Sequence, residues 1–159
     1  MKKLLILATL LFSVNAFSSE TVTVKSCNDG DTCKIVSKSG RIKTLRLANI
    51  DAPEFAHFGW GMQPFAVESR IAITNLCVGK QAVFTRLKKE TYGRQYGTLV
   101  CDGKDVSTEM VSSGLAWRYK YSRDKNILAL SEKAKSEKVG IWSSENPVDP
   151  WLWRKNRMH

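Results

Sequence analysis

The sequence has little of what membrane-spanning helices, zinc sites and repetitive fibres require. Its apolar run at residues 4–12 is far shorter than the about 20 residues that a spanning helix needs. It has only two histidines, and its cysteines lack the spacing of zinc ligands, which disfavours a zinc site. Ten glycines and four prolines exclude collagen-like and low-complexity chains. The 159 residues, 43% hydrophobic and 25% charged, therefore have the composition of one globular domain.

The first 16 residues have the pattern of a secretory signal peptide. Lys2 and Lys3 precede the apolar run, and the small residues at positions 14 and 16 follow it. We predict cleavage after Ala16, with a second possible site after Ser18, and export to the periplasm or the medium. The alternative is an uncleaved membrane anchor, which the length of the run disfavours.

Positive charge dominates the chain. Lysine and arginine number 25 against 15 acidic residues, a formal net charge of +10. Such a surface suits nucleic acid, anionic lipid or acidic polysaccharide, and it also serves solubility alone. Charge by itself therefore does not decide the partner.

Hydrophobic alternation and turn residues predict five short strands and about three helices. The strands are expected at residues 21–25, 33–37, 41–47, 81–86 and 96–101, with a polar loop at 88–94. The helices are expected at residues 64–77, 106–113 and 126–138. This order predicts an α+β protein, an OB-type five-stranded barrel with packed helices at residues 17–146. A basic, aromatic tail follows at residues 147–159, and we expect a monomer.

Four cysteines lie in the exported part, and an even number in an oxidising compartment favours two disulfides. Three pairings are possible, and we favour Cys27–Cys33 and Cys77–Cys101. The first pair would face each other across a hairpin and clamp the turn between them. The second would join the first helix to the fifth strand.

Three acidic residues are candidates for a metal site. Asp31 ends the first turn, and Asp51 and Glu54 follow the third strand, so in a meander all three can lie on one rim of the barrel. They would repel one another unless a cation joined them, and their oxygen ligands suit Ca²⁺ or Mg²⁺. The alternative is that each is an ordinary turn or loop acid.

The same region resembles the staphylococcal nuclease (thermonuclease) family. The similar segments run, in order, through Asp29-Gly30-Asp31-Thr32, Arg46-Leu47, Ile50-Asp51-Ala52-Pro53-Glu54, Tyr92-Gly93-Arg94, Asp102-Gly103-Lys104, Gly114-Leu115-Ala116 and Gly140-Ile141-Trp142. The resemblance extends from about residue 21 to residue 142, and its order and spacing match all five active-site positions of the family. The chain departs from the family in the loop after Glu54, which is shorter and more aromatic.

The resemblance implies a phosphodiesterase that depends on one Ca²⁺ ion, cleaves DNA and RNA endonucleolytically and leaves 3′-phosphate ends. By position, Asp31, Asp51 and the backbone oxygen of Ala52 would bind the ion. Arg46 and Arg94 would hold the phosphate, and Glu54 would activate or orient the attacking water. The residue types suit this chemistry, because arginine binds phosphate through two parallel donors and a metal ion polarises a phosphoryl group.

Three tyrosines are candidates for substrate binding. Tyr92, Tyr119 and Tyr121 can stack on bases, and the family has tyrosines near the last two positions. The alternative interpretation is that these tyrosines only cover one end of the barrel. For the whole protein the alternatives are a non-catalytic OB-fold nucleic-acid binder and a cationic surface-binding protein.

Overall fold

The computed structural model describes residues 18–56 and 61–157. The predicted signal peptide lies outside the described residues. In the part of the chain that is described, no helix is long and apolar enough to cross a membrane.

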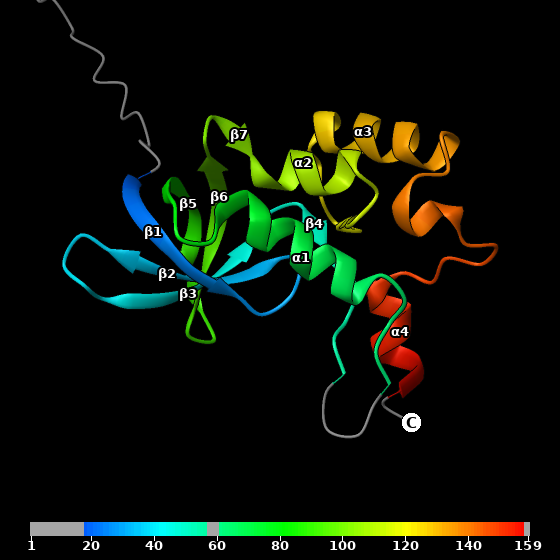
Figure 1. The fold of residues 1–159 in the computed structure, drawn as a ribbon, viewed down its shortest axis with the longest axis horizontal. Coiled ribbons are helices and arrows are strands. Elements are labelled where there is room, and N and C mark those ends of the chain that lie inside the picture. Colours follow the sequence, from blue (N-terminus) through cyan, green and yellow to red (C-terminus); the bar gives the residue numbers. More distant parts are fainter. Residues whose placement is uncertain (1–17, 57–60, 158–159) are drawn as a thin grey trace, which may run out of the picture.

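Five strands form the predicted OB-type barrel in the described part of the chain. They are β1 (Ser19–Cys27), β2 (Thr32–Ser37), β3 (Ile42–Leu47), β5 (Gln81–Thr91) and β6 (Arg94–Cys101). The sheet has the order β3-β2-β1-β5-β6-β7, and a parallel pairing of β3 with β6 closes it (Figure 1). In this pairing Thr44 lies opposite Arg94 and Leu47 opposite Gly97. The closure brings the last residues of β3 beside the first residues of β6.

The barrel interior is filled by every second residue of the strands, as the alternation of the sequence predicts. In β6 each alternate residue is buried, and in β1 Val22 and Val24 point inward. Gly97 permits the close approach of β5 to β6, since a Cβ there would lie 2.1 Å from the carbonyl oxygen of Thr85. The core therefore begins in the barrel and continues into the helices around it.

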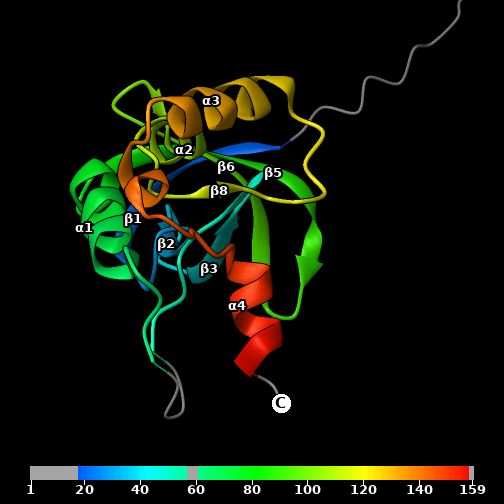
Figure 2. The same cartoon turned by 90° about the vertical axis from the view of Figure 1, so that its right-hand side faces the viewer.

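Four α-helices surround the barrel within residues 18–56 and 61–157. They are α1 (Ala66–Cys77), α2 (Val106–Ser112), α3 (Lys125–Ser136) and α4 (Pro150–Arg157). The short elements are β4 (Ile50–Asp51), β7 (Lys104–Asp105), β8 (Trp117–Arg118) and the 3₁₀ helix η1 (Gly140–Ser143). Helices α2 and α3 pack side by side, whereas α4 stands apart from them beside the open rim (Figures 1 and 2).

Three details differ from the sequence-based expectations. The polar loop expected at residues 88–94 is mostly strand, because Tyr92 and Gly93 alone turn the chain, both with positive φ. Pro64 does not begin the first helix, which starts at Ala66 after a left-handed Phe65. The tail contains helix α4, whose first turn is capped by the side chain of Asp149, an acceptor 2.8 Å from the Leu152 N–H.

Both favoured disulfides are present in the structure. Cys27 pairs with Cys33, at opposed positions of the β1–β2 hairpin. Cys77 at the end of α1 pairs with Cys101 at the end of β6. The first bond brackets the turn that carries Asp31, and the second fastens α1 to the barrel.

The two disulfides should differ in their effect on stability. The Cys77–Cys101 bond closes a loop of 24 residues and the Cys27–Cys33 bond one of only six. Loop-closure entropy then predicts that Cys77→Ala/Cys101→Ala lowers the free energy of unfolding by about 3 kcal/mol, and Cys27→Ala/Cys33→Ala by about 2 kcal/mol. Urea unfolding of both double variants measures the difference. A larger loss from the short-loop variant would contradict this ranking.

Candidate active site

The turn between β1 and β2 places Asp31 on the rim of the barrel. The Asp29 carboxylate accepts a hydrogen bond from the Asp31 N–H at 3.0 Å, which closes the turn locally. Gly30 packs against α1, where a Cβ would meet the Ser69 hydroxyl oxygen at 1.8 Å and the Ala52 Cβ at 2.9 Å. Only glycine therefore allows the turn to lie so close to α1 and to the segment after β4.

Asp31 and Asp51 are buried neighbours joined by one arginine. Arg46 on β3 contacts the Asp31 carboxylate at 2.9 Å through Nη1 and the Asp51 carboxylate at 2.8 Å through Nη2. Asp31 also accepts the Ala52 N–H at 2.6 Å and the Thr32 hydroxyl at 3.0 Å. The exposed fractions of the Asp31 and Asp51 side chains are 6% and 7%. Two acidic side chains 20 residues apart in the sequence thus bind one guanidinium and are almost fully removed from solvent.

A second arginine reaches the same acids from helix α4. The Arg154 guanidinium bonds Asp51 Oδ2 at 2.9 Å and Oδ1 at 3.3 Å, and it also pairs with the Glu54 carboxylate. Burial alone would lower the pKa of Arg154, but the hydrogen bonds and charges of Asp51 and Glu54 outweigh it and raise that pKa. The sequence shows Arg154 only as part of a basic tail, and no spacing signal connects residue 154 to residue 51.

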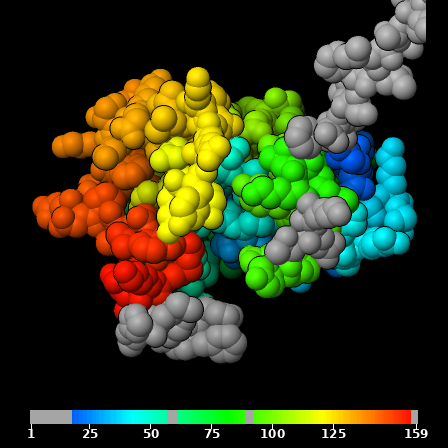
Figure 3. Space-filling view, turned by 180° about the vertical axis from the view of Figure 1, so that it is seen from behind, coloured from blue at the N-terminus to red at the C-terminus, as the bar shows by residue number. Residues whose placement is uncertain are grey.

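One cavity of about 340 Å³ collects the predicted residues. We call it the rim cavity; its lining is Asp29, Asp31, Thr32, Arg46, Asp51, Ala52, Pro53, Glu54, Arg94, Tyr119 and Arg154. Figure 3 shows the recess between α4 (red) and the β5–β6 hairpin (green), with cyan-coloured chain at its bottom. Every acidic and basic residue that the sequence pointed to, Asp31, Arg46, Asp51, Glu54 and Arg94, lies in this lining.

The three tyrosines predicted to bind substrate lie at two different places around the cavity. Tyr119 lines the rim cavity, and Tyr121 packs edge-on against it with ring centroids 5.5 Å apart. Tyr92 is 93% exposed at the tip of the β5–β6 hairpin and lines an adjoining hollow with Arg46 and Arg94. An aromatic side chain is thus available on two sides of the arginines, at the cavity and at the hairpin tip, and base stacking by each stays a prediction.

Burial leaves Asp31 short of compensating charge. Desolvation raises the pKa of Asp31 from 3.8 to about 8, because the attraction of Arg46 does not offset the loss of water, and Asp29 and Asp51 add repulsion. The ionised form of a buried carboxyl group of this kind is stabilised by any further cation that binds beside it.

The donor set fits a hard divalent cation. Asp31 and Asp51 present carboxylate oxygens within one cavity, and oxygen ligands are those that Ca²⁺ and Mg²⁺ prefer. Among the described residues, no three acidic, histidine or cysteine side chains lie together in a group that could hold a metal ion. Instead, Arg46 joins Asp31 to Asp51, and Arg154 joins Asp51 to Glu54. Ion binding by Asp31, Asp51 and the Ala52 carbonyl stays a prediction.

Comparison with known proteins identifies similar sequences. Residues 44–144 match the family model described as "Staphylococcal nuclease homologue". A Haemophilus influenzae protein named as an uncharacterized endonuclease is 34% identical over 158 residues, which cover 97% of this chain and 85% of that protein. An Escherichia coli O157:H7 protein of the same description is 34% identical over 131 residues, 81% of each chain.

A plant protein is similar over part of its length. The staphylococcal-like nuclease CAN1 of Arabidopsis thaliana is 33% identical over 125 residues, which cover 78% of this chain but 36% of that protein. This chain therefore spans most of the two bacterial proteins and about a third of the plant one.

The raised pKa of Asp31 predicts how metal-free stability depends on pH. Between 3.8 and about 8 the folded protein keeps a proton on Asp31 that the unfolded chain releases, so the free energy of unfolding falls as pH rises through this range. This group contributes a slope of at most about 1.4 kcal/mol per pH unit. Asp31→Asn should therefore gain stability relative to the wild type between pH 5 and pH 8.

Urea unfolding in the presence of chelator, at pH 5 and pH 8, measures this gain. Asp102→Asn is the control, because the Asp102 side chain is 64% exposed and lies on the distant β6–β7 turn. A difference between Asp31→Asn and the wild type that stays constant with pH would show that Asp31 does not carry the effect.

Proposed function

The chain belongs to the staphylococcal nuclease family, and on this premise we propose that it is a Ca²⁺-dependent phosphodiesterase that hydrolyses DNA and RNA. The observation that carries the proposal is the rim cavity, in which two buried carboxylates, Asp31 and Asp51, lie beside Arg46, Arg94 and Glu54. Relatives named as endonucleases and as a staphylococcal-like nuclease support the reaction class.

Each residue has a role that suits its chemistry. Asp31, Asp51 and the Ala52 carbonyl would hold the ion, which polarises the phosphoryl group and favours ionisation of a nearby water. Arg46 and Arg94 come from paired strands that meet at the rim and present planar guanidinium groups to the phosphate oxygens. Glu54, 35% exposed, would accept a proton from the water that attacks phosphorus.

The proposed products follow from which bond breaks. Attack on phosphorus with departure of the 5′ oxygen leaves a 3′-phosphate on one fragment and a 5′-hydroxyl on the other. The departing oxygen requires a proton, and water at the open rim can donate it. We propose endonucleolytic cleavage of this kind, with Tyr92, Tyr119 and Tyr121 stacking on neighbouring bases.

Export is part of the proposal. The signal-like residues 1–16 and two disulfides are typical of proteins made for an oxidising compartment. We propose a periplasmic or secreted monomer.

The alternative is an OB-fold binder without catalysis. A phosphate channel that only binds has no use for the Asp31, Asp51 and Glu54 carboxylates, because they repel the nucleic acid backbone. Their presence in the rim cavity favours the enzyme.

Nuclease activity should depend on Ca²⁺. Plasmid DNA and total RNA incubated with the purified protein should be degraded with millimolar Ca²⁺ and left intact with excess chelator. Mass spectrometry of oligonucleotide products should find 3′-phosphate termini. Full activity in chelator would contradict the role of the ion, and tight binding without cleavage in Ca²⁺ would favour the non-catalytic alternative.

Single substitutions in the rim cavity should lower turnover without unfolding the protein. Glu54→Gln removes the proton acceptor and Arg94→Ala removes a phosphate contact, and each should reduce kcat by about 10²- to 10³-fold. Arg41→Ala, in the exposed β2–β3 turn, is the matched control and should keep wild-type kcat. Circular dichroism and unfolding midpoints test that the fold is retained. A kcat for either site variant equal to that of the control would refute its assigned role.

A further inference from the structure

We propose that Arg154 is a third phosphate-binding arginine of the active site, supplied by the C-terminal helix α4; the inference rests on the proposed function and extends it. Its guanidinium lines the rim cavity together with Arg46 and Arg94. It pairs with Asp51, a proposed ligand of the ion, and with Glu54, the proposed proton acceptor. The side chain is 37% exposed, so a substrate can reach it from the open rim.

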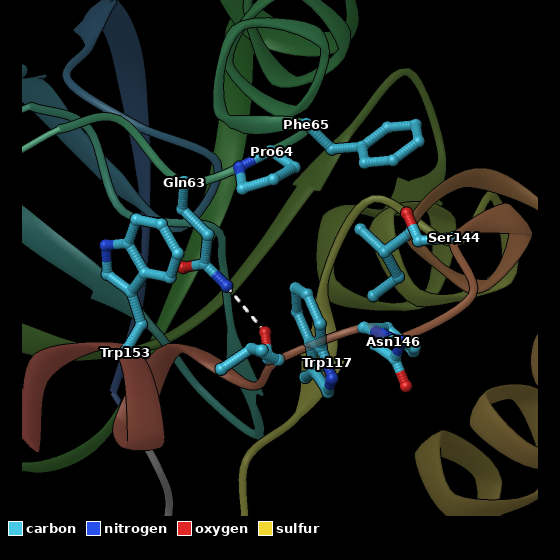
Figure 4. Close-up of a pocket in the computed structure, with 10 residues that line it drawn as sticks. Gln63, Pro64, Phe65, Trp117, Ser144, Asn146 and Trp153 are labelled. Carbon is cyan, nitrogen blue, oxygen red and sulfur yellow. Dashed lines mark hydrogen bonds between the residues drawn. The ribbon is translucent and has the colours of Figure 1, made fainter. Parts of the chain in front are cut away.

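Helix α4 is fastened on both sides, so the position of Arg154 is built into the fold. On one side, the Lys120 ammonium lies 3.5 Å from the centre of the Trp151 ring. On the other side, Gln63 joins the segment just before α4 to the loop that carries Glu54. Its Oε1 accepts the Glu54 N–H at 3.0 Å. Its Nε2 donates to the Val148 carbonyl at 2.6 Å, the hydrogen bond dashed in Figure 4.

The turn of α4 that carries Arg154 also packs on the protein. Trp153 lies beside Gln63 at one edge of a cavity of about 200 Å³, with Pro64, Phe65 and Trp117 around it (Figure 4). Asp149 caps the helix, and its carbonyl accepts the Trp153 N–H at 3.0 Å. These contacts set the direction from which Arg154 enters the rim cavity.

The charges of the rim cavity explain what Arg154 does when a cation arrives. Among the described residues, four acidic side chains and three arginines line this cavity. Asp51 and Glu54 are the acids that Arg154 now neutralises. If Asp31 and Asp51 held a divalent cation, Arg154 would lose part of this attraction and would be repelled by the ion. Its planar fork of two donors would then suit the anionic oxygens of a substrate phosphate.

Two measurable consequences follow from this exchange of partners. Because Arg154 and the cation share Asp51, removal of the guanidinium should leave Ca²⁺ affinity without nucleotide equal to that of the wild type or higher. Because Arg154 then binds phosphate, its removal should weaken nucleotide affinity once Ca²⁺ is present. A purely structural role for α4 predicts neither combination.

The experiment compares Arg154→Met and Arg154→Lys with Lys155→Met and the wild type. Lys155 is the matched control, an exposed cation on the same helix and outside the rim cavity. Calorimetry measures the Kd of Ca²⁺ alone and the Kd of thymidine 3′,5′-bisphosphate at saturating Ca²⁺, a probe without a diester bond to cleave. Kinetics on a short oligonucleotide separate kcat from KM, and unfolding midpoints report on the fold.

We expect the Kd of the bisphosphate to rise about tenfold or more in Arg154→Met, as for a lost hydrogen bond between charged groups. Arg154→Lys should give a smaller rise, since it keeps the charge but loses the fork. Lys155→Met should stay within about twofold of the wild type, as expected for an exposed charge outside the site. For Arg154→Met we also expect a higher KM and Ca²⁺ affinity no weaker than that of the wild type.

Two results would overturn the inference. An unchanged bisphosphate Kd in Arg154→Met would exclude the phosphate contact. A weaker Ca²⁺ affinity with unchanged nucleotide binding would instead make Arg154 a positioning residue for Asp51. If Arg154→Met fails to fold, Arg154→Lys is compared with Lys155→Met instead. A larger bisphosphate Kd for Arg154→Lys than for Lys155→Met supports the phosphate contact, and equal values exclude it. A wild-type protein that binds the bisphosphate through Arg154 but cleaves neither DNA nor RNA would refute the proposed reaction and leave the phosphate contact standing.

Discussion

The site depends on compensating the charge of two carboxylates, Asp31 and Asp51, that are almost fully removed from water. In the structure this compensation comes from Arg46 and Arg154, which contact the acids at 2.8–2.9 Å. It is incomplete for Asp31, whose pKa burial raises to about 8. Buried charges that are only partly paired are costly, and proteins keep them where a ligand completes the pairing. The same feature that costs stability is therefore the basis of the proposed cation and phosphate site.

The barrel makes this arrangement possible through its closure. Arg46 and Arg94 lie on β3 and β6, the two strands whose parallel pairing closes the sheet, and Asp31 lies in the turn just beside Arg46 in the β2–β3 ladder. Strand pairing fixes the backbone within a hydrogen-bonded ladder, so these side chains begin from rigid positions. Gly30 lets the turn lie against α1, and the Cys27–Cys33 bond joins the two strands on either side of the turn. Core packing and catalytic geometry are thus set by the same contacts.

Much of this architecture could be predicted from sequence because the signals are local. Alternation predicted the barrel strands, the turn motif predicted the hairpin around Asp31, and opposed positions predicted the Cys27–Cys33 bond. The two strands of the β5–β6 hairpin were predicted, but their extension to a two-residue turn was missed. Tyr92-Gly93 lacks the Asn or Asp typical of such a turn, although both residues have positive φ. The place of Arg154 could not be derived either. It depends on a docked helix 103 residues beyond Asp51, and no periodicity encodes such a contact.

The position of α4 has a consequence for how the site responds to its surroundings. Barrel residues share the stability of the whole core, whereas a short terminal helix held by a few side-chain contacts can open at a lower free energy than the core. Arg154 is carried by this helix, whereas its partners, Asp51 and Glu54, lie on the rim of the barrel. In the proposed exchange of partners, an arginine carried in this way leaves the carboxylates without any rearrangement of the barrel. Its place on α4 would then separate the rigid strands of the site from the one side chain that changes partners.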